Sequence, residues 1–205
     1  MSTVGRLPAV SAIVLAGGRA ARFGRDKLAE EVGGVPLLHH AIDRVATVAT
    51  EILVAGGVAR MDLDREIPVR RIQDPVPDGG PLVGVLAGLE AAREPAALIV
   101  AGDMPTLATP VLTLLIRALD SADPQAVDGV ALRYRGRVEP LPVVVRTGAA
   151  TATARRSLGH GSRSLLGWLE SLRIQRIDER EWRALDPTAA TLLDVDRPAD
   201  LERLT

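Results

Sequence analysis

The sequence predicts an α/β fold, a three-layer sandwich whose sheet is mostly parallel with an antiparallel excursion in the C-terminal half. Short apolar runs alternate with longer segments of helical period, which is typical of parallel strands joined by crossover helices. Past Asp120 the pattern changes, and two apolar segments flank a turn at residues 135–137, which favours an antiparallel pair. The 205 residues, 47% of them hydrophobic, suit a single domain spanning residues 1–205.

The apolar runs predict parallel strands at residues 11–16, 51–55, 69–73 and 97–101. Pro36 and Pro110 are expected in the first turns of two helices, the second capped by Thr109, because proline tolerates that position. A third helix is expected after Gly80. The remaining expected elements are the antiparallel strands 130–134 and 141–146, a helix at 162–172, a strand at 173–177 and a terminal helix from Pro198.

Composition excludes several classes of protein. A net charge of −1 provides no general field for nucleic acid, and 2% aromatic residues leave few surfaces on which bases could stack. The absence of cysteine excludes disulfides, thiolate nucleophiles and Cys-based metal sites. No signal peptide is recognisable, and no apolar run approaches the roughly 18 residues of a membrane span. We therefore expect a cytoplasmic protein that binds neither nucleic acid nor membranes.

Lys27 is the single lysine among 25 basic residues, and it ends a glycine-rich loop that follows the first expected strand. Arginine presents a wide planar fork, whereas lysine carries a compact charge that fits between crowded phosphate oxygens. Gly17 and Gly18 let backbone N–H groups approach an anion, and Arg22 and Lys27 can neutralise a polyphosphate. The spacing is neither that of a Walker A loop nor that of a dinucleotide-binding loop. The alternative is a tight turn with solvated cations.

Asp103 follows the expected strand at residues 97–101, directly before Met104 and Pro105. Ligands of an open parallel sheet bind beyond the carboxyl ends of its strands, so this carboxylate and the glycine loop are expected at one edge. Mg²⁺ prefers one or two carboxylates together with water and phosphate oxygens. Asp103 is therefore a candidate Mg²⁺ ligand, with capping of a helix as the alternative.

Three further carboxylates each allow a functional and a structural interpretation. Asp74 ends the third expected strand shortly before Gly79 and Gly80, so it either forms a turn or belongs with Gly80 to a site for the base of a nucleotide. Asp194 and Asp196 alternate in a short extended segment near the C-terminus. One of them could face the metal, and Asp196 could instead cap the last helix.

Several motifs together resemble the nucleotidyltransferase family that includes molybdenum cofactor guanylyltransferase. They are the segment from Leu15-Ala16-Gly17-Gly18 to Lys27, then Gly80-Pro81-Leu82-Val83-Gly84, then Gly102-Asp103-Met104-Pro105, and the segments 139–144, 161–165 and 193–201. The glycine loop is specific to the superfamily as a whole. The Gly-Pro-Leu-x-Gly segment favours the guanylyl branch.

The resemblance implies a Rossmann-like domain that transfers GMP from GTP to the terminal phosphate of molybdopterin and releases pyrophosphate. The residues implied in GTP binding are Leu15, Ala16, Gly17, Lys27, Asp74 and Asp103, the last through Mg²⁺. Arg22, Lys27 and Asp103 would be the catalytic residues. The family's two C-terminal asparagines are Asp194 and Asp196 in this chain.

Two alternatives stay open from the sequence. One is a transferase that uses CTP or that serves a sugar phosphate or phospholactate on the same scaffold. The other is a nucleotide-binding protein without turnover. A protein that transiently delivers the cofactor is also left open as a partner.

Overall fold

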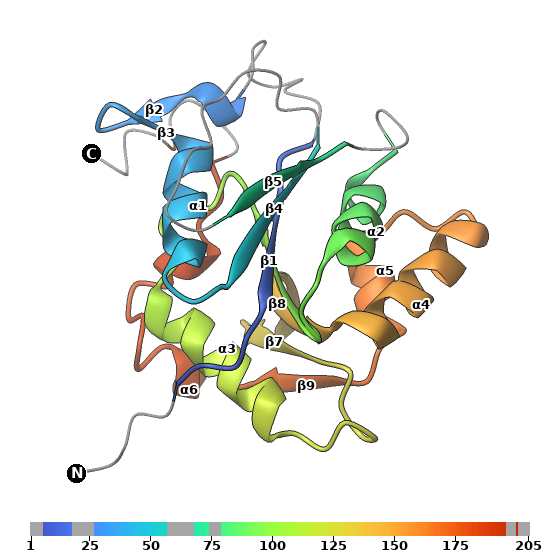
Figure 1. Ribbon diagram of the computed structural model, residues 1–205. Coiled ribbons are helices and arrows are strands. Elements are labelled where there is room, and N and C mark those ends of the chain that lie inside the picture. The colour runs from blue at the N-terminus through green and yellow to red at the C-terminus, as the bar shows by residue number, and fades with distance from the viewer. Residues whose placement is uncertain (1–5, 18–26, 57–67, 74–78, 196–199, 201–205) are drawn as a thin grey trace.

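The computed structural model describes residues 6–17, 27–56, 68–73, 79–195 and residue 200 (Figure 1). A seven-stranded sheet with the order β5-β4-β1-β6-β8-β7-β9 forms its centre. The strands of this sheet are β1 (Ser11–Leu15), β4 (Glu51–Ala55), β5 (Val69–Ile72), β6 (Ala96–Ala101), β7 (Gly129–Tyr134), β8 (Arg137–Arg146) and β9 (Ile174–Ile177). A separate two-stranded hairpin consists of β2 (Glu31–Val32) and β3 (Val35–Pro36).

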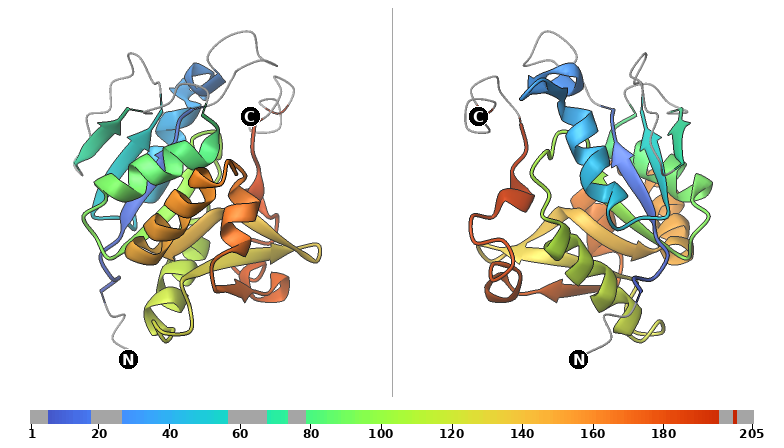
Figure 2. Two further views of the ribbon diagram at one scale, coloured as in Figure 1. Left: turned by 90° about the vertical axis from the view of Figure 1, so that its right-hand side faces the viewer. Right: turned by 60° about the vertical axis from the view of Figure 1, so that its left-hand side comes forward.

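Helices cover both faces of the sheet. They are α1 (Leu37–Ala46), α2 (Pro81–Ala91), α3 (Thr109–Ser121), α4 (Thr147–Gly159), α5 (Leu165–Glu170) and α6 (Glu179–Trp182), with 3-10 turns η1 (Lys27–Ala29) and η2 (Ala190–Leu192). One apolar core lies between the sheet and α1, α3 and α6, and a second lies between the sheet and α2, α4 and α5 (Figures 1 and 2). None of the described helices has the length and apolar composition needed to cross a bilayer.

The predicted fold class is confirmed. Strands β5, β4, β1 and β6 are mutually parallel, and β8 runs antiparallel to both β6 and β7. Each core strand is buried on both faces because helices cover both, which explains the continuous apolar runs in the sequence.

Several local predictions were wrong. Pro36 ends β3 and directly precedes α1, so it does not lie in the first helical turn. Thr109 is the first residue of α3 and Pro110 the second, and the Thr109 hydroxyl shares a hydrogen bond with Thr47 at 3.1 Å instead of capping the helix. The helix expected at residues 162–172 is limited to α5, and the terminal helix expected from Pro198 lies outside the described residues.

At the amino end of the sheet, the carboxylate of Glu51 joins two strands and a loop. It accepts hydrogen bonds from Ser11 Oγ at 2.7 Å, from the Arg93 backbone N–H at 2.7 Å and from Arg70 Nη2 at 2.8 Å. Burial raises the pKa of Glu51, but these hydrogen bonds together outweigh it, and the net pKa is lowered. This end of the sheet is therefore closed by polar contacts.

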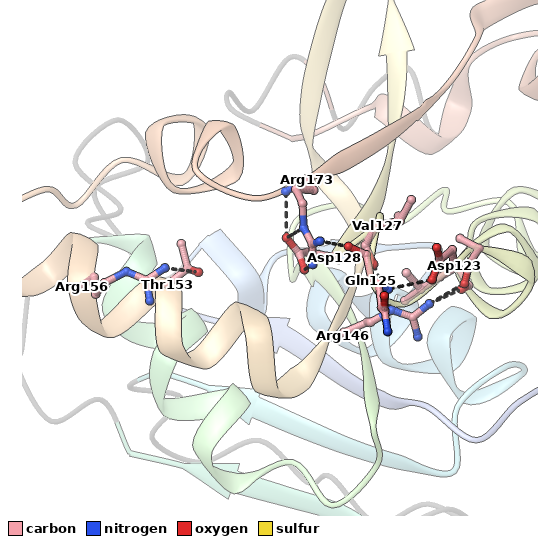
Figure 3. A network of polar contacts seen from close by, with 10 residues as sticks. Asp123, Gln125, Val127, Asp128, Arg146, Thr153, Arg156 and Arg173 are labelled. Atoms are coloured by element: carbon pink, nitrogen blue, oxygen red, sulfur yellow. Dashed lines mark hydrogen bonds and ion pairs between the residues drawn. The ribbon is translucent and has the colours of Figure 1, made fainter.

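A second polar network fastens the antiparallel half of the molecule (Figure 3). Arg146, at the end of β8, donates hydrogen bonds to the carbonyls of Leu119, Ala122 and Val127. Asp128 pairs with Arg173, with 2.5 Å between Oδ1 and Nη2, and the hydrogen bonds from Arg173 hold the pKa of Asp128 below its usual value despite burial. These arginines therefore link the end of α3 to the start of β7 and the approach to β9.

Candidate active site

The carboxyl ends of β1 and β4 meet in direct backbone contact. Ala16 N donates to the Ala55 carbonyl at 2.8 Å, and the next residue of the second strand, Gly56, has φ of 132°. A Cβ on Gly56 would lie 2.5 Å from the backbone N of Gly17, which is closer than real side chains approach. Glycine at position 56 therefore lets the start of the glycine loop pass over the end of β4.

The carboxyl end of β6 is joined to β1 in a similar way. Gly102 N donates to the Leu15 carbonyl at 2.9 Å. A Cβ on Gly102 would lie 3.1 Å from that carbonyl oxygen and 3.4 Å from Leu28 Cδ1, so the loop after β6 packs tightly under η1. This close approach brings Asp103, the next residue, beside Lys27.

Lys27 and Asp103 form an ion pair, with 2.5 Å between Nζ and Oδ2. The two side chains are 20% and 18% exposed, so the pair is partly accessible at the edge of the sheet. They come from loops that follow two neighbouring parallel strands, β1 and β6. The structure therefore brings together the lone lysine and the carboxylate that the sequence singles out.

The second oxygen of Asp103 is suited to a cation. Oδ1 is buried and has no hydrogen-bond partner among the described residues, and such an atom is costly to leave unsatisfied. In the same described part of the chain, no group of three or more His, Cys, Asp or Glu side chains could hold a metal by itself. Asp103 therefore fits a divalent ion that takes its remaining ligands from water and from substrate phosphates.

A glycine corner at residues 79–80 begins α2 at this edge. Gly80 is the N-cap residue, with φ of 89°, and Pro81 follows in the first turn. Arg163 holds the corner from the other side, because its Nη1 donates to the Gly79 carbonyl at 2.7 Å. A Cβ on Gly80 would lie 3.4 Å from Arg163 Cβ, so the arginine side chain also packs over the corner.

Glycines within α2 set its position on β1. A Cβ on Gly84 would lie 3.5 Å from Leu15 Cδ2, and one on Gly88 would lie 2.5 Å from Ile13 Cγ2. The helix therefore packs closely enough for its first turn to lie beside the end of β1. Leu15 and the Gly80-Pro81-Leu82-Val83-Gly84 segment are thus neighbours in space.

The antiparallel half contributes to the same edge. Because β8 runs opposite to β6, its early residues continue past the carboxyl end of β6, where Glu139 lies. Burial, the larger cause, and the nearby charge of Asp194 raise the pKa of Glu139, while Arg137 opposes the rise. Val195 N donates to the Asp103 carbonyl at 3.1 Å, so the C-terminal segment that carries Asp194 also reaches this edge.

The described residues include six of the predicted site residues, and four lie outside them. Leu15, Ala16, Gly17, Lys27, Gly80 and Asp103 are described, and all lie at the carboxyl edge of the sheet. Gly18, Arg22, Asp74 and Asp196 lie outside the described residues. The structure therefore brings the first group together.

Sequence reasoning missed two features of this edge. Arg163 lies within the segment 161–165, and nothing in the residue types of that segment indicates a hydrogen bond to the Gly79 carbonyl. The sequence offered Asp194 or Asp196 as a residue that faces the metal, but the hydrogen bonds of residues 190–195 to the loop after β6 were not expected. A turn at Asp186-Pro187 is readable from the residue types, but the hydrogen bonds of the residues after it to Thr106 and Ala108 are not.

Comparison with known proteins identifies the family. The model of the MobA-like NTP transferase domain matches residues 12–174. A protein from Chloroflexus aggregans named "Probable molybdenum cofactor guanylyltransferase" is 33% identical over 196 residues, covering 94% of this chain and 92% of that protein.

Solved structures share the fold. "Molybdopterin-guanine dinucleotide biosynthesis protein A" from Archaeoglobus fulgidus has a TM-score of 0.75 and 21% identity, covering 95% of this chain and 96% of that one. The 2-C-methyl-D-erythritol 4-phosphate cytidylyltransferase from Thermus thermophilus has a TM-score of 0.69 and 17% identity, covering 96% and 97%. At these identities the likeness is one of fold. The match over residues 12–174 goes further, and the chain belongs to the family of MobA-like NTP transferase domains.

Proposed function

We propose that this protein transfers the guanylyl group of GTP to the terminal phosphate of molybdopterin, releasing pyrophosphate. Family membership and the names of the relatives at about a third identity support a nucleotidyltransferase of this kind. The observation that carries the proposal is the 2.5 Å pair of Lys27 and Asp103 at the sheet edge where ligands of such folds bind. The pair combines a charge for phosphate with a carboxylate for a divalent ion.

The reaction needs positioning and charge neutralisation more than covalent help. The oxygen of the acceptor phosphate forms a bond to the α-phosphorus of GTP, and the bond from that phosphorus to the oxygen bridging to the β-phosphate breaks. The nucleophile is already ionised at neutral pH, so no residue has to remove a proton. Lys27 neutralises the charge that grows on the leaving pyrophosphate, and we assign the same role to Arg22 in the glycine loop.

Asp103 is proposed to hold Mg²⁺ through its buried oxygen. When bound, the ion would supply positive charge to the α-phosphate and bring the two anionic substrates together. Lys27 and Asp103 balance one another in the ligand-free protein, so neither of these two charges is unpaired before the nucleotide and its cation arrive.

The base and ribose are proposed to bind on the α2 side of the triphosphate. The backbone of residues 15–18 would follow the phosphates, and the glycine corner at residues 79–80 would lie against the base, because it has no side chains to obstruct a flat ring. Asp74 would accept hydrogen bonds from the donor edge of guanine. A carboxylate suits guanine here, since that edge offers two adjacent N–H donors.

Pyrophosphate release tests the proposed function. With molybdopterin and Mg²⁺ present, we expect release from GTP and none above background from ATP, CTP or UTP. GTP with Mg²⁺ should also raise the melting temperature more than the other nucleotides do. Release from CTP in place of GTP would show a cytidylyltransferase, and tight GTP binding without pyrophosphate would show a binding protein without turnover.

Replacing Arg163 tests the base side of the site. Arg163→Ala removes the charge-assisted bond to Gly79, which is worth about 1.5–3 kcal/mol, so we expect the KM for GTP to rise about tenfold while kcat stays within about threefold. Arg155→Ala is the matched control, because it breaks an exposed ion pair to Glu90 of the same helix α2. An unchanged KM for GTP in Arg163→Ala would remove the glycine corner from the nucleotide site.

A further inference from the structure

Residues 186–195, which we call the tether, cross the loop that follows β6 although they lie more than eighty positions away in the chain. Thr106 Oγ1 donates to the Ala190 carbonyl at 2.7 Å, and Ala108 N donates to Thr191 Oγ1 at 3.1 Å. The third bond joins Val195 N to the carbonyl of Asp103 itself, at 3.1 Å. The tether therefore contacts the loop at Asp103 itself and at two residues that follow it.

The tether has a fixed shape of its own because of a buried carboxylate. Asp186 is 5% exposed and accepts hydrogen bonds from Ala190 N at 3.0 Å and Thr191 N at 2.7 Å. Thr188 Oγ1 adds a weaker bond at 3.2 Å. This turn presents the Thr191 hydroxyl to the loop, and the Thr191 side chain is fully buried.

The loop makes a different set of contacts on its other side, where Asp103 pairs with Lys27. Gly102 N bonds to the Leu15 carbonyl, and Met104 N makes a bond of 3.3 Å to Ala101. Met104 and Leu107 are buried apolar side chains, and apolar packing does not fix orientation as hydrogen bonds do. The ion pair with Lys27 holds one oxygen of the Asp103 side chain, and the tether adds the hydrogen bond to the Asp103 carbonyl and the bonds to the residues that follow.

We propose that Thr191, held in place by Asp186, is a positioning residue that orients Asp103 for the divalent ion. This inference rests on the proposed function, because it assigns Asp103 the metal. Thr191 touches neither substrate nor metal. It acts by holding Ala108, and the tether as a whole holds the Asp103 carbonyl, so that the buried Oδ1 of Asp103 keeps one direction.

The test uses Thr191→Val, which keeps the shape of the side chain and removes the acceptor for Ala108 N. The measured quantity is the dissociation constant of Mn²⁺, by calorimetry, with the full-length protein saturated by a GTP analogue whose α,β-bridge is a methylene group. We expect the dissociation constant of Mn²⁺ to rise about tenfold in Thr191→Val. We expect Thr191→Ser, which restores the hydroxyl, to stay within about twofold of the wild type. Binding of the analogue without metal should not change.

Thr188→Val is the matched control, since it removes a hydroxyl from the same turn without touching the loop, and its Mn²⁺ affinity should match the wild type. Thr106→Val, which removes the bond to Ala190 from the loop side, serves if Thr191→Val does not fold, and it should weaken Mn²⁺ binding similarly. A variant with a lower melting temperature but unchanged Mn²⁺ affinity would show that the tether is only structural and would overturn the proposal.

The proposed function and the positioning role fail in different ways. If the wild type binds Mn²⁺ with the analogue and Thr191→Val binds it equally well, only the positioning role is overturned. If Thr191→Val weakens Mn²⁺ binding but the wild type releases no pyrophosphate from GTP, only the proposed function is overturned. A wild type that binds no Mn²⁺ with the analogue overturns both.

Discussion

Replacing Asp103 with alanine is expected to lower turnover by about a thousandfold or more while the protein stays folded. The substitution removes the carboxylate proposed to hold the divalent ion, and charge stabilisation by such an ion is worth several kcal/mol in phosphoryl transfer. Folding should change little, because the ion pair with Lys27 is partly exposed and such pairs contribute about 1 kcal/mol or less. Pyrophosphate release at saturating Mg²⁺ and a thermal melt measure the two quantities.

Two further variants complete that experiment: Asp103→Asn tests the charge of the side chain, and Asp120→Ala is the control. Asparagine keeps the shape of the side chain but lacks its charge, so we expect a loss close to that of alanine. Asp120 is an exposed carboxylate in α3, and its removal should leave turnover unchanged. Wild-type turnover in Asp103→Ala would remove the residue from the site.

Replacing Lys27 is expected to lower kcat with GTP even when the new residue is arginine. Lys27→Met should lower kcat with GTP by about a hundredfold to a thousandfold, because the leaving pyrophosphate loses a directly placed positive charge. Lys27→Arg should recover about tenfold at most. The ammonium lies 2.5 Å from the Asp103 carboxylate, and a wide planar guanidinium cannot reproduce the compact charge of lysine at this short distance.

Steady-state kinetics with GTP and molybdopterin measure these effects, and Arg44→Met, which removes an exposed cation from α1, is the control. If Lys27→Arg equals the wild type, charge alone matters and the compact shape of lysine does not. That outcome would also leave the single lysine among 24 arginines without a chemical reason.

The meeting of Lys27 and Asp103 could be predicted because it follows from the sheet. Asp103 stands just beyond one apolar run and Lys27 ends the glycine loop that follows another, and runs of this kind become parallel strands whose carboxyl ends share one edge. The register of β1 with β6 then places the two loops side by side. A glycine at position 102 completes the contact, and its motif was visible in the sequence.

Helix α4 could not be predicted in the same way. It buries Ala150, Thr153 and Ala154, and such small side chains produce no apolar stripe in the sequence. The tether was equally hidden, because Thr191 bonds to the main chain of Ala108 and any residue there offers the same N–H. Contacts made by backbone atoms leave no pattern of residue types to read.

Because β8 runs opposite to β6, the two sides of the site are built from different kinds of segment. Residues proposed for the nucleotide come from βα loops after β1, β5 and β6, whereas Glu139 enters from the start of a strand and Asp194 from the tether. Changes within residues 137–142 can therefore alter one side of this edge without changing the βα loops that carry Lys27 and Asp103. The two sides of the edge can thus change independently in the course of evolution.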